Sequence, residues 1–143
     1  MPGKLMGIDH GLKRIGLAVS DSSRLVAREL AIIRRESRQR DFEQINRIAS
    51  EEQVAGIIVG LPENEQPGKQ AAMVRKWAER LAETTSLPII LWDEQLSSQD
   101  AQELARQKRR KPDEPIDDLA ARVILQSYLD AARDGLAPEL PRE

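Results

Sequence analysis

Hydrophobic and polar positions along this chain follow two periods, which separate strands from helices. The segments 4–9 and 14–20 are expected to form a β-hairpin. In 14–20, large apolar residues alternate with small ones, the period of two that is typical of a strand. A third strand is expected over 25–33. Two further apolar, β-branched runs, 54–60 and 89–92, have the composition of strands that are buried on both faces, as parallel strands usually are.

Helices are predicted between and after these strands, because apolar residues there recur every three or four positions. The first covers 39–52 and the second 70–84, a third starts where Ser97 or Ser98 provides an N-cap, and the last runs from 116 to 133. The second helix carries an apolar face made of Met73, Val74, Trp77, Ala78 and Leu81.

The resulting order of elements, βββαβαβαα, predicts the α/β fold class. We expect one mixed five-stranded sheet, with a three-stranded antiparallel N-terminal part, two parallel strands and helices on both faces. Segment 61–68 is expected to be a loop, because two prolines and a glycine interrupt it. The 143 residues are expected to form a single domain over 1–143, with a flexible tail over 136–143.

The composition excludes or disfavours several kinds of chemistry. The chain has no Cys and only one His, His10, which excludes disulfides and cysteine nucleophiles and disfavours a Ser-His-Asp triad. It has no apolar run of membrane-spanning length and no apolar signal segment, so we expect a cytoplasmic protein with no membrane partner. The net charge of −2 predicts no general affinity for nucleic acid.

Basic residues nevertheless gather in two clusters, and local basic clusters can bind phosphates. The first cluster consists of Arg34, Arg35, Arg38 and Arg40. The second consists of Arg106, Lys108, Arg109, Arg110 and Lys111. The alternative is that both clusters are solvated helix ends. With 3% aromatic residues, an aromatic platform for single-stranded nucleic acid is disfavoured.

Acidic residues stand at the ends of three predicted elements. Asp9 ends the first strand, Asp93 and Glu94 end the last strand, and Asp117 and Asp118 open the final helix. Ligands of open α/β sheets bind outside the carboxyl ends of the strands. Asp9 and the Asp93/Glu94 pair are therefore expected at one edge of the sheet.

Helical spacing distinguishes the two aspartates of the final helix. Asp117 falls on the apolar face, where an inward carboxylate needs a partner or a metal ion. Asp118 is aligned with Arg122 and is expected to form a surface pair with it. Simpler roles remain open for each acid: Asp117 as a helix cap, Asp9 in an Asx turn and Glu94 at a solvated strand end.

Three converging carboxylates would repel one another strongly unless a divalent cation lay between them. Oxygen ligands favour Mg²⁺ or Mn²⁺, and two such ions about 4 Å apart can activate water on a phosphodiester. The turn after Asp9 brings Lys13 and Arg14 close to it, where they can neutralise substrate phosphates. Glycines surround Asp9 and indicate close approach of another backbone or a ligand: Gly7, Gly11 and Gly16.

Several motifs, in order and over nearly the whole chain, resemble the YqgF family, also called RuvX. They are GIDHGLKRIGLAVSD at 7–21, IIVGLP at 57–62, WDEQLSSQDA at 92–101, and IDDLAA at 116–121 continued by ILQSYLD at 124–130. The resemblance implies a ribonuclease H-like fold and a metal-dependent nuclease. The family is described both as a Holliday junction resolvase and as the nuclease that matures the 5′ end of pre-16S ribosomal RNA.

The motif match implies that Asp9, Glu94 and Asp117 are the catalytic residues and the ligands of Mg²⁺ or Mn²⁺. These acids coincide with those found at the element ends. The chain departs from the family pattern in two places. The family usually has an arginine after the Asp-Glu pair, where this chain has Gln95, and the loop over 63–68 is shorter and lacks the usual Asn-Met-Asp-Gly sequence.

We therefore expect an endonuclease of the two-metal-ion type, as a monomer or weak homodimer. The preference for RNA, in 5′-end maturation of pre-16S rRNA, is implied by the family resemblance alone, because nothing in the residues distinguishes RNA from DNA. One alternative is a Holliday junction resolvase acting on four-way DNA, which needs a symmetric dimer to make paired cuts. A second is a non-catalytic nucleic-acid-binding module, which Gln95 favours and the intact carboxylates disfavour. An ATP-using member of the broad fold is disfavoured by the short chain and the missing phosphate loops.

Overall fold

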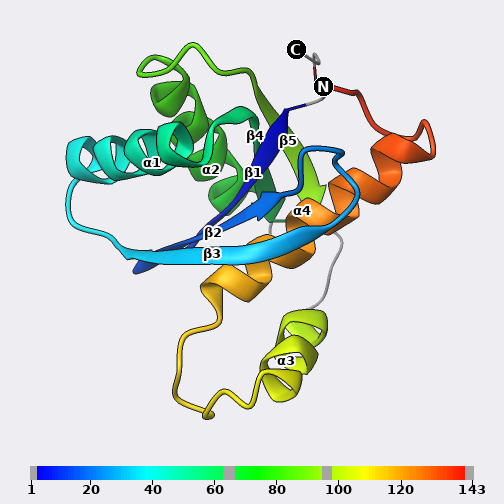
Figure 1. The fold of residues 1–143 in the computed structure, drawn as a ribbon. Helices are drawn as coiled ribbons and strands as arrows, with labels where there is room; N and C mark the ends of the chain where they lie inside the picture. The colour runs from blue at the N-terminus through cyan, green and yellow to red at the C-terminus, as the bar shows by residue number, and fades with distance from the viewer. Residues whose placement is uncertain (1–2, 63–66, 95–97, 141–143) are drawn as a thin grey trace.

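A single mixed sheet forms the centre of the computed structural model, which describes residues 3–62, 67–94 and 98–140. The strand order is β3-β2-β1-β4-β5 (Figure 1). The strands are β1 (Lys4–His10), β2 (Arg14–Ser20), β3 (Ala27–Arg34), β4 (Val54–Pro62) and β5 (Ile89–Glu94). The pairs β1–β2 and β2–β3 are antiparallel, and β1–β4 and β4–β5 are parallel. The predicted sheet is confirmed.

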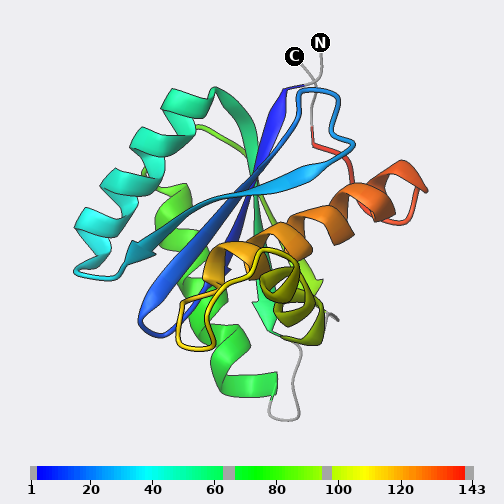
Figure 2. The same cartoon turned by 60° about the horizontal axis from the view of Figure 1, so that its bottom comes forward.

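Helices cover both faces of the sheet. Those in the described part of the chain are α1 (Arg38–Glu52), α2 (Pro67–Ala82), α3 (Ser98–Gln107) and α4 (Asp117–Arg133). Helices α1 and α2 lie on one face, α4 crosses the other, and α3 packs on α4 away from the sheet (Figures 1 and 2). No described helix is both long enough and apolar enough to cross a lipid bilayer.

Alternate residues of the central strands supply two apolar cores, one on each face of the sheet. Met6 and Ile8 of β1 belong to the core on the side of α1 and α2, which also contains Trp77 of α2. Leu5 of β1 packs on the other side with Leu125 of α4. Successive residues of the N-terminal hairpin thus contribute in turn to the two cores, and the sheet is covered on both faces.

Some boundaries differ from the sequence prediction. Strand β4 extends to Pro62, because Leu61 and Pro62 continue the pairing with the last residues of β5. Helix α2 begins at Pro67, a residue expected in the loop, since proline is tolerated in the first turn of a helix. Met73 was predicted to lie on the buried face of α2 but is 49% exposed, because that face is centred on Val74 and Trp77.

The C-terminal segment packs against the sheet as far as Leu140, which is 5% exposed. This differs from the expected flexible tail over 136–143, of which 141–143 lie outside the described residues. The buried side chain of Arg24 holds the segment: its Nε donates to the Gly3 carbonyl at 2.7 Å and its Nη1 to the Leu140 carbonyl at 2.9 Å. Both ends of the described chain are therefore fixed at one point.

Candidate active site

Asp9 lies near the carboxyl end of β1, and its partner in the antiparallel register is Gly16 of β2. The backbone of Asp117, the first residue of α4, packs directly against Gly16. A Cβ placed on Gly16 would lie 1.8 Å from the carbonyl oxygen of Asp117, a distance that no real side chain could adopt. The glycine therefore lets α4 begin directly beside Asp9.

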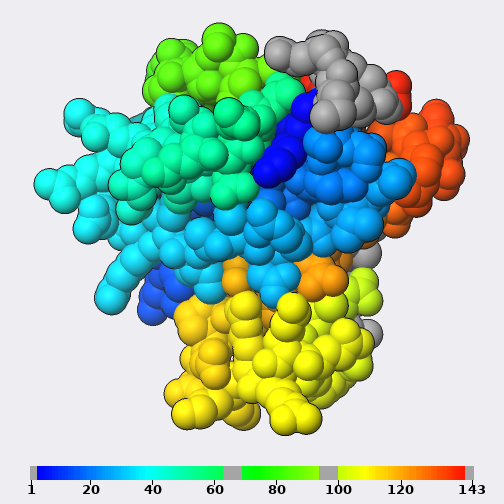
Figure 3. Space-filling view, in the orientation of Figure 1, coloured from blue at the N-terminus to red at the C-terminus, as the bar shows by residue number. Residues whose placement is uncertain are grey.

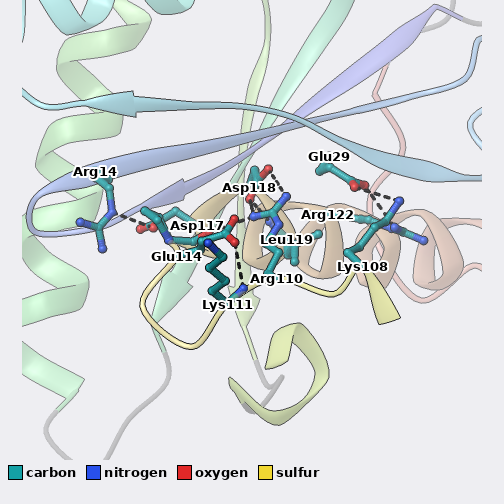
Figure 4. A network of polar contacts seen from close by, with 11 residues as sticks. Arg14, Glu29, Lys108, Arg110, Lys111, Glu114, Asp117, Asp118, Leu119 and Arg122 are labelled. Carbon is teal, nitrogen blue, oxygen red and sulfur yellow. Dashed lines mark hydrogen bonds and ion pairs between the residues drawn. The ribbon is translucent and has the colours of Figure 1, made fainter. Parts of the chain in front are cut away.

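Asp117 is held in place by a cation from the neighbouring strand. The Nε of Arg14 donates to Oδ1 of Asp117 at 2.9 Å (Figure 4). The other carboxylate oxygen faces Gly11, 3.3 Å from the position that a Cβ would occupy there. The turn after β1 and the start of α4 thus form one cluster around Asp9.

The two carboxylates interact electrostatically. Burial of Asp9 and the negative charge of Asp117 raise the pKa of Asp9 to about 6. A carboxyl group whose pKa is raised by both causes is typical of a site that binds a cation or transfers a proton. The structure thereby brings together two of the three acids that were proposed from the sequence.

Glu94, the third proposed acid, is the last residue of β5. Strands β1, β4 and β5 are parallel, so their carboxyl ends share the edge of the sheet where Asp9 lies. The side chain of Glu94 is outside what the structure describes, as are Gln95 and segment 63–66. Within residues 3–62, 67–94 and 98–140, no group of three His, Cys, Asp or Glu residues is placed to hold a metal ion. The three-acid site stays a prediction.

The turn between β1 and β2 carries Lys13 and is fixed by hydrogen bonds. The Gly11 N–H donates to the Arg14 carbonyl at 2.9 Å. Arg35, which was grouped with the first basic cluster, donates from Nη1 to the carbonyls of Gly11 and Leu12 at 3.0 and 3.3 Å. Its role in bracing this turn could not be found from sequence, because Arg35 lies 24 and 23 positions after the two carbonyls that it contacts, and no local pattern reports such a contact.

His10 follows Asp9 in the chain but packs on the opposite face of the sheet. Its ring lies 4.6 Å from that of Trp77, centroid to centroid, and its Nε2 is buried with no hydrogen-bond partner among the described residues. Burial and the positive charge of Arg35 lower the pKa of His10 to about 4. His10 is therefore a neutral packing residue at physiological pH.

Asp118 was predicted to form a surface pair with Arg122, and this prediction is wrong. Asp118 is buried and pairs with Arg110, whose Nη1 and Nη2 lie 2.6 and 2.8 Å from the two carboxylate oxygens. Arg122 instead pairs with Glu29 of β3 at 3.1 Å (Figure 4). The segment between α3 and α4 folds back over the start of α4, which helical spacing alone does not reveal.

Two cations of the second basic cluster form ion pairs with acidic residues of this chain. Arg110 pairs with Asp118, and Lys108 contacts Glu29 at 3.1 Å. These pairs attach α3 and the following loop to α4 and β3; the same segment forms a lobe that projects from the surface in the space-filling view (Figure 3). For these two residues the structure supports a structural role.

Replacing Arg110 by Met is expected to lower the free energy of unfolding by about 2 kcal/mol, because the buried Asp118 carboxylate loses its partner. Urea denaturation measures this change. Arg106→Met is the matched control: its partner Glu103 is exposed, and we expect a much smaller loss, because solvent screens an exposed ion pair. Equal losses in the two variants would contradict the structural role of the Arg110–Asp118 pair.

The strand order and the strand directions define the fold class of this protein as ribonuclease H-like. Thermus thermophilus RuvC in complex with a Holliday junction substrate is similar with a TM-score of 0.64, over 96% of this chain and 99% of that chain, at 17% identity. The fowlpox virus resolvase in complex with Holliday junction DNA gives 0.57, over 90% of this chain and 98% of that chain, at 12% identity. These likenesses show the fold.

The family model described as "RuvX: Holliday junction resolvase" matches residues 3–131, and the chain belongs to this family. A candidate pre-16S rRNA nuclease of Thermoanaerobacter pseudethanolicus is 45% identical over 137 residues, covering 92% of this chain and 99% of the relative. A protein of the same description from Clostridioides difficile is 40% identical, covering 91% and 96%. The predicted family, fold and nuclease class are confirmed.

Proposed function

We propose that this protein is a metal-dependent endonuclease that matures the 5′ end of pre-16S rRNA. The observation that carries the proposal is that Asp9 and Asp117 lie close enough to repel each other electrostatically, beside Arg14, at the carboxyl edge of the sheet. Relatives that bear this description are similar over nine-tenths of the chain, which supports the choice of RNA. A cytoplasmic location and a monomer or weak homodimer remain part of the proposal.

The donor set fits a divalent cation. Asp9 and Asp117 offer the oxygen ligands that Mg²⁺ and Mn²⁺ prefer, and neutralising their mutual repulsion favours binding. Position 94 shares a strand face with Ile90 and Trp92, which pack in the core under α4, and we propose Glu94 as the third ligand. When bound, the ions supply the positive charge that stabilises the phosphate and activates water.

The chain's own cations then bind and orient the substrate. Arg14 uses its Nε on Asp117 and is 41% exposed, so its remaining guanidinium nitrogens face solvent beside the acids. Lys13 is exposed on the adjoining turn. We assign both to phosphate groups that flank the bond to be cleaved, where point charges and bidentate donors suit phosphate oxygens.

The test compares end-labelled pre-16S RNA with a four-way DNA junction, each with Mg²⁺, Mn²⁺ or EDTA. We expect metal-dependent cuts in the RNA that disappear in Asp9→Asn and persist in Asp130→Asn, a charge-matched change at a half-buried position in the last turns of α4. No cleavage of either substrate, with binding retained, would favour the non-catalytic binding module and overturn the proposal.

The resolvase alternative is favoured by the family description and by the RuvC-like fold. Paired cuts in the junction, with no cuts in the RNA, would select it. Because symmetric cutting needs two copies, sedimentation at the assay concentration provides a second criterion. A protein that is monomeric throughout would count against this alternative.

A further inference from the structure

A groove adjoins the Asp9–Asp117 cluster at the tip of the β1–β2 hairpin and combines cations with exposed apolar residues. Its lining consists of Leu12, Lys13, Arg14, Arg34, Arg35 and Pro115, together with Glu36, whose carboxylate pairs with Arg40 at 3.5 Å. Four cations and one already-paired acid make the groove a site of positive potential, despite the net charge of −2.

Two of these cations are available to a ligand. In the described part of the chain, Lys13 and Arg34 have no carboxylate within 4.0 Å, and both are exposed. Arg34 also lies directly opposite Arg14 in the register of β2 and β3. Asp117 offsets the charge of Arg14 but not that of Arg34, so an anion bound beside Arg34 relieves the repulsion that remains between the two guanidinium groups. Phosphate groups meet this requirement.

Leu12 gives the groove a second property. Its side chain is 75% exposed at the tip of the turn, although the backbone there is held by hydrogen bonds from Arg35. A single exposed leucine is ordinary. This one is fixed among cations and faces the same groove as exposed Pro115, so a ligand that fills the groove needs both negative charge and an apolar surface.

Nucleotides combine these two properties, but only when their bases are accessible. A duplex presents phosphates outward and hides the faces of its bases in the stack, whereas a single strand exposes base faces to side chains. A groove built for duplex phosphates alone would gain nothing from Leu12. The combination of Leu12 with Lys13 and Arg34 therefore selects unpaired nucleotides.

We propose that this groove binds the single-stranded nucleotides that flank the scissile phosphate, with Leu12 against a base and Lys13 and Arg34 on phosphates. The inference rests on the proposed function for the position of the scissile phosphate at Asp9 and Asp117. It goes further by stating what kind of nucleic acid lies beside the cleaved bond.

The test of the phosphate contacts measures fluorescence anisotropy of a labelled single-stranded RNA, the same sequence as DNA, and the corresponding duplex, in EDTA over a range of salt. For Lys13→Gln/Arg34→Gln we expect about tenfold weaker binding of both single strands. The slope of log K against log[salt] should fall by about 1.4, since each single-strand contact contributes about 0.7. Arg133→Gln, at the opposite end of α4, should change neither quantity.

The test of the apolar contact uses Leu12→Ser with Leu12→Met as the conservative control. Leu12→Ser should weaken single-strand binding about fivefold with no change in the salt slope or in duplex binding, and Leu12→Met should restore it. Equal affinity of Leu12→Ser and the parent for single strands would overturn the proposal, as would equal losses for single strand and duplex. These assays need neither metal nor cleavage, so their failure is distinct from failure of the proposed activity.

Discussion

Asp9→Asn is expected to abolish cleavage and, at the same time, to stabilise the metal-free protein. The loss of activity should be on the order of 10³-fold, as when a group that stabilises transition-state charge is removed. The gain in stability follows from the raised pKa of Asp9, because burial and Asp117 make its ionised form unfavourable in the folded state. An amide has the same shape and no charge, so the repulsion disappears.

The pKa of Asp9 determines how the free energy of unfolding changes with pH. The pKa of Asp9 is about 6 in the folded protein and near 3.8 in the unfolded chain, so the folded state binds more protons between these values. The free energy of unfolding of the parent therefore falls as pH rises from about 4 to 6. At pH 8 in EDTA, Asp9→Asn should be more stable than the parent by roughly 2 kcal/mol, discounted for partial exposure of Asp9.

Urea denaturation at pH 4 and pH 8 measures this difference. His10 shifts stability in the opposite direction over an overlapping range, because its lowered pKa favours the unfolded state below pH 6.5. The informative quantity is therefore the difference between variant and parent, in which the His10 contribution cancels. A variant that is less stable than the parent at pH 8 would show that burial and Asp117 do not destabilise the ionised form of Asp9.

Gly16→Ala is expected to impair both stability and cleavage, although Gly16 carries no side chain. The new Cβ would lie 1.8 Å from the carbonyl oxygen of Asp117 and 2.2 Å from its carbonyl carbon, so the start of α4 must move. We expect a loss of about 3 kcal/mol in the free energy of unfolding. Cleavage should fall about 10²-fold even where the variant is folded, because a shift of about 1 Å in a reacting group has that effect.

Gly56→Ala provides the matched control for this change. Its Cβ would meet the end of the Leu140 side chain at 2.5 Å, which can rotate away, and Leu140 belongs to the core on the α4 face. We expect a smaller loss of stability and unchanged cleavage. If Gly16→Ala cleaves RNA as well as Gly56→Ala does, the position of Asp117 is not set by contact with Gly16.

The sequence predicted those features that local periodicity reports. Alternation in 14–20 and the β-branched runs in 54–60 and 89–92 identify buried strands. The ends of the strands predicted over 4–9 and 89–92 place Asp9 and Glu94 on one edge of the sheet. The glycine next to Asp9 in the sheet, Gly16, was expected to mark close approach of a backbone or a ligand. In the structure the approaching backbone is that of Asp117.

Contacts between residues that are far apart in sequence could not be predicted from local patterns. Helical spacing paired Asp118 with Arg122, but the partner of Asp118 is Arg110, because the path of the preceding loop decides which cation arrives. Similarly, a cluster of arginines has the same appearance in sequence whether its members bind phosphate or brace a turn, as Arg35 does. Only the fold separates these roles.

The two-core arrangement has a further consequence for how motion is distributed in this molecule. Strand β1 has hydrogen-bonded neighbours on both edges and apolar layers on both faces, so its amides become accessible only through opening of the whole domain. Helix α3 packs mainly on α4, and its local opening requires far less free energy. We therefore expect amide exchange to be slow in β1, which carries Asp9, and faster in α3 and in the loop that leads from it to Asp117. Adjustments at this edge are accordingly expected on the α4 side.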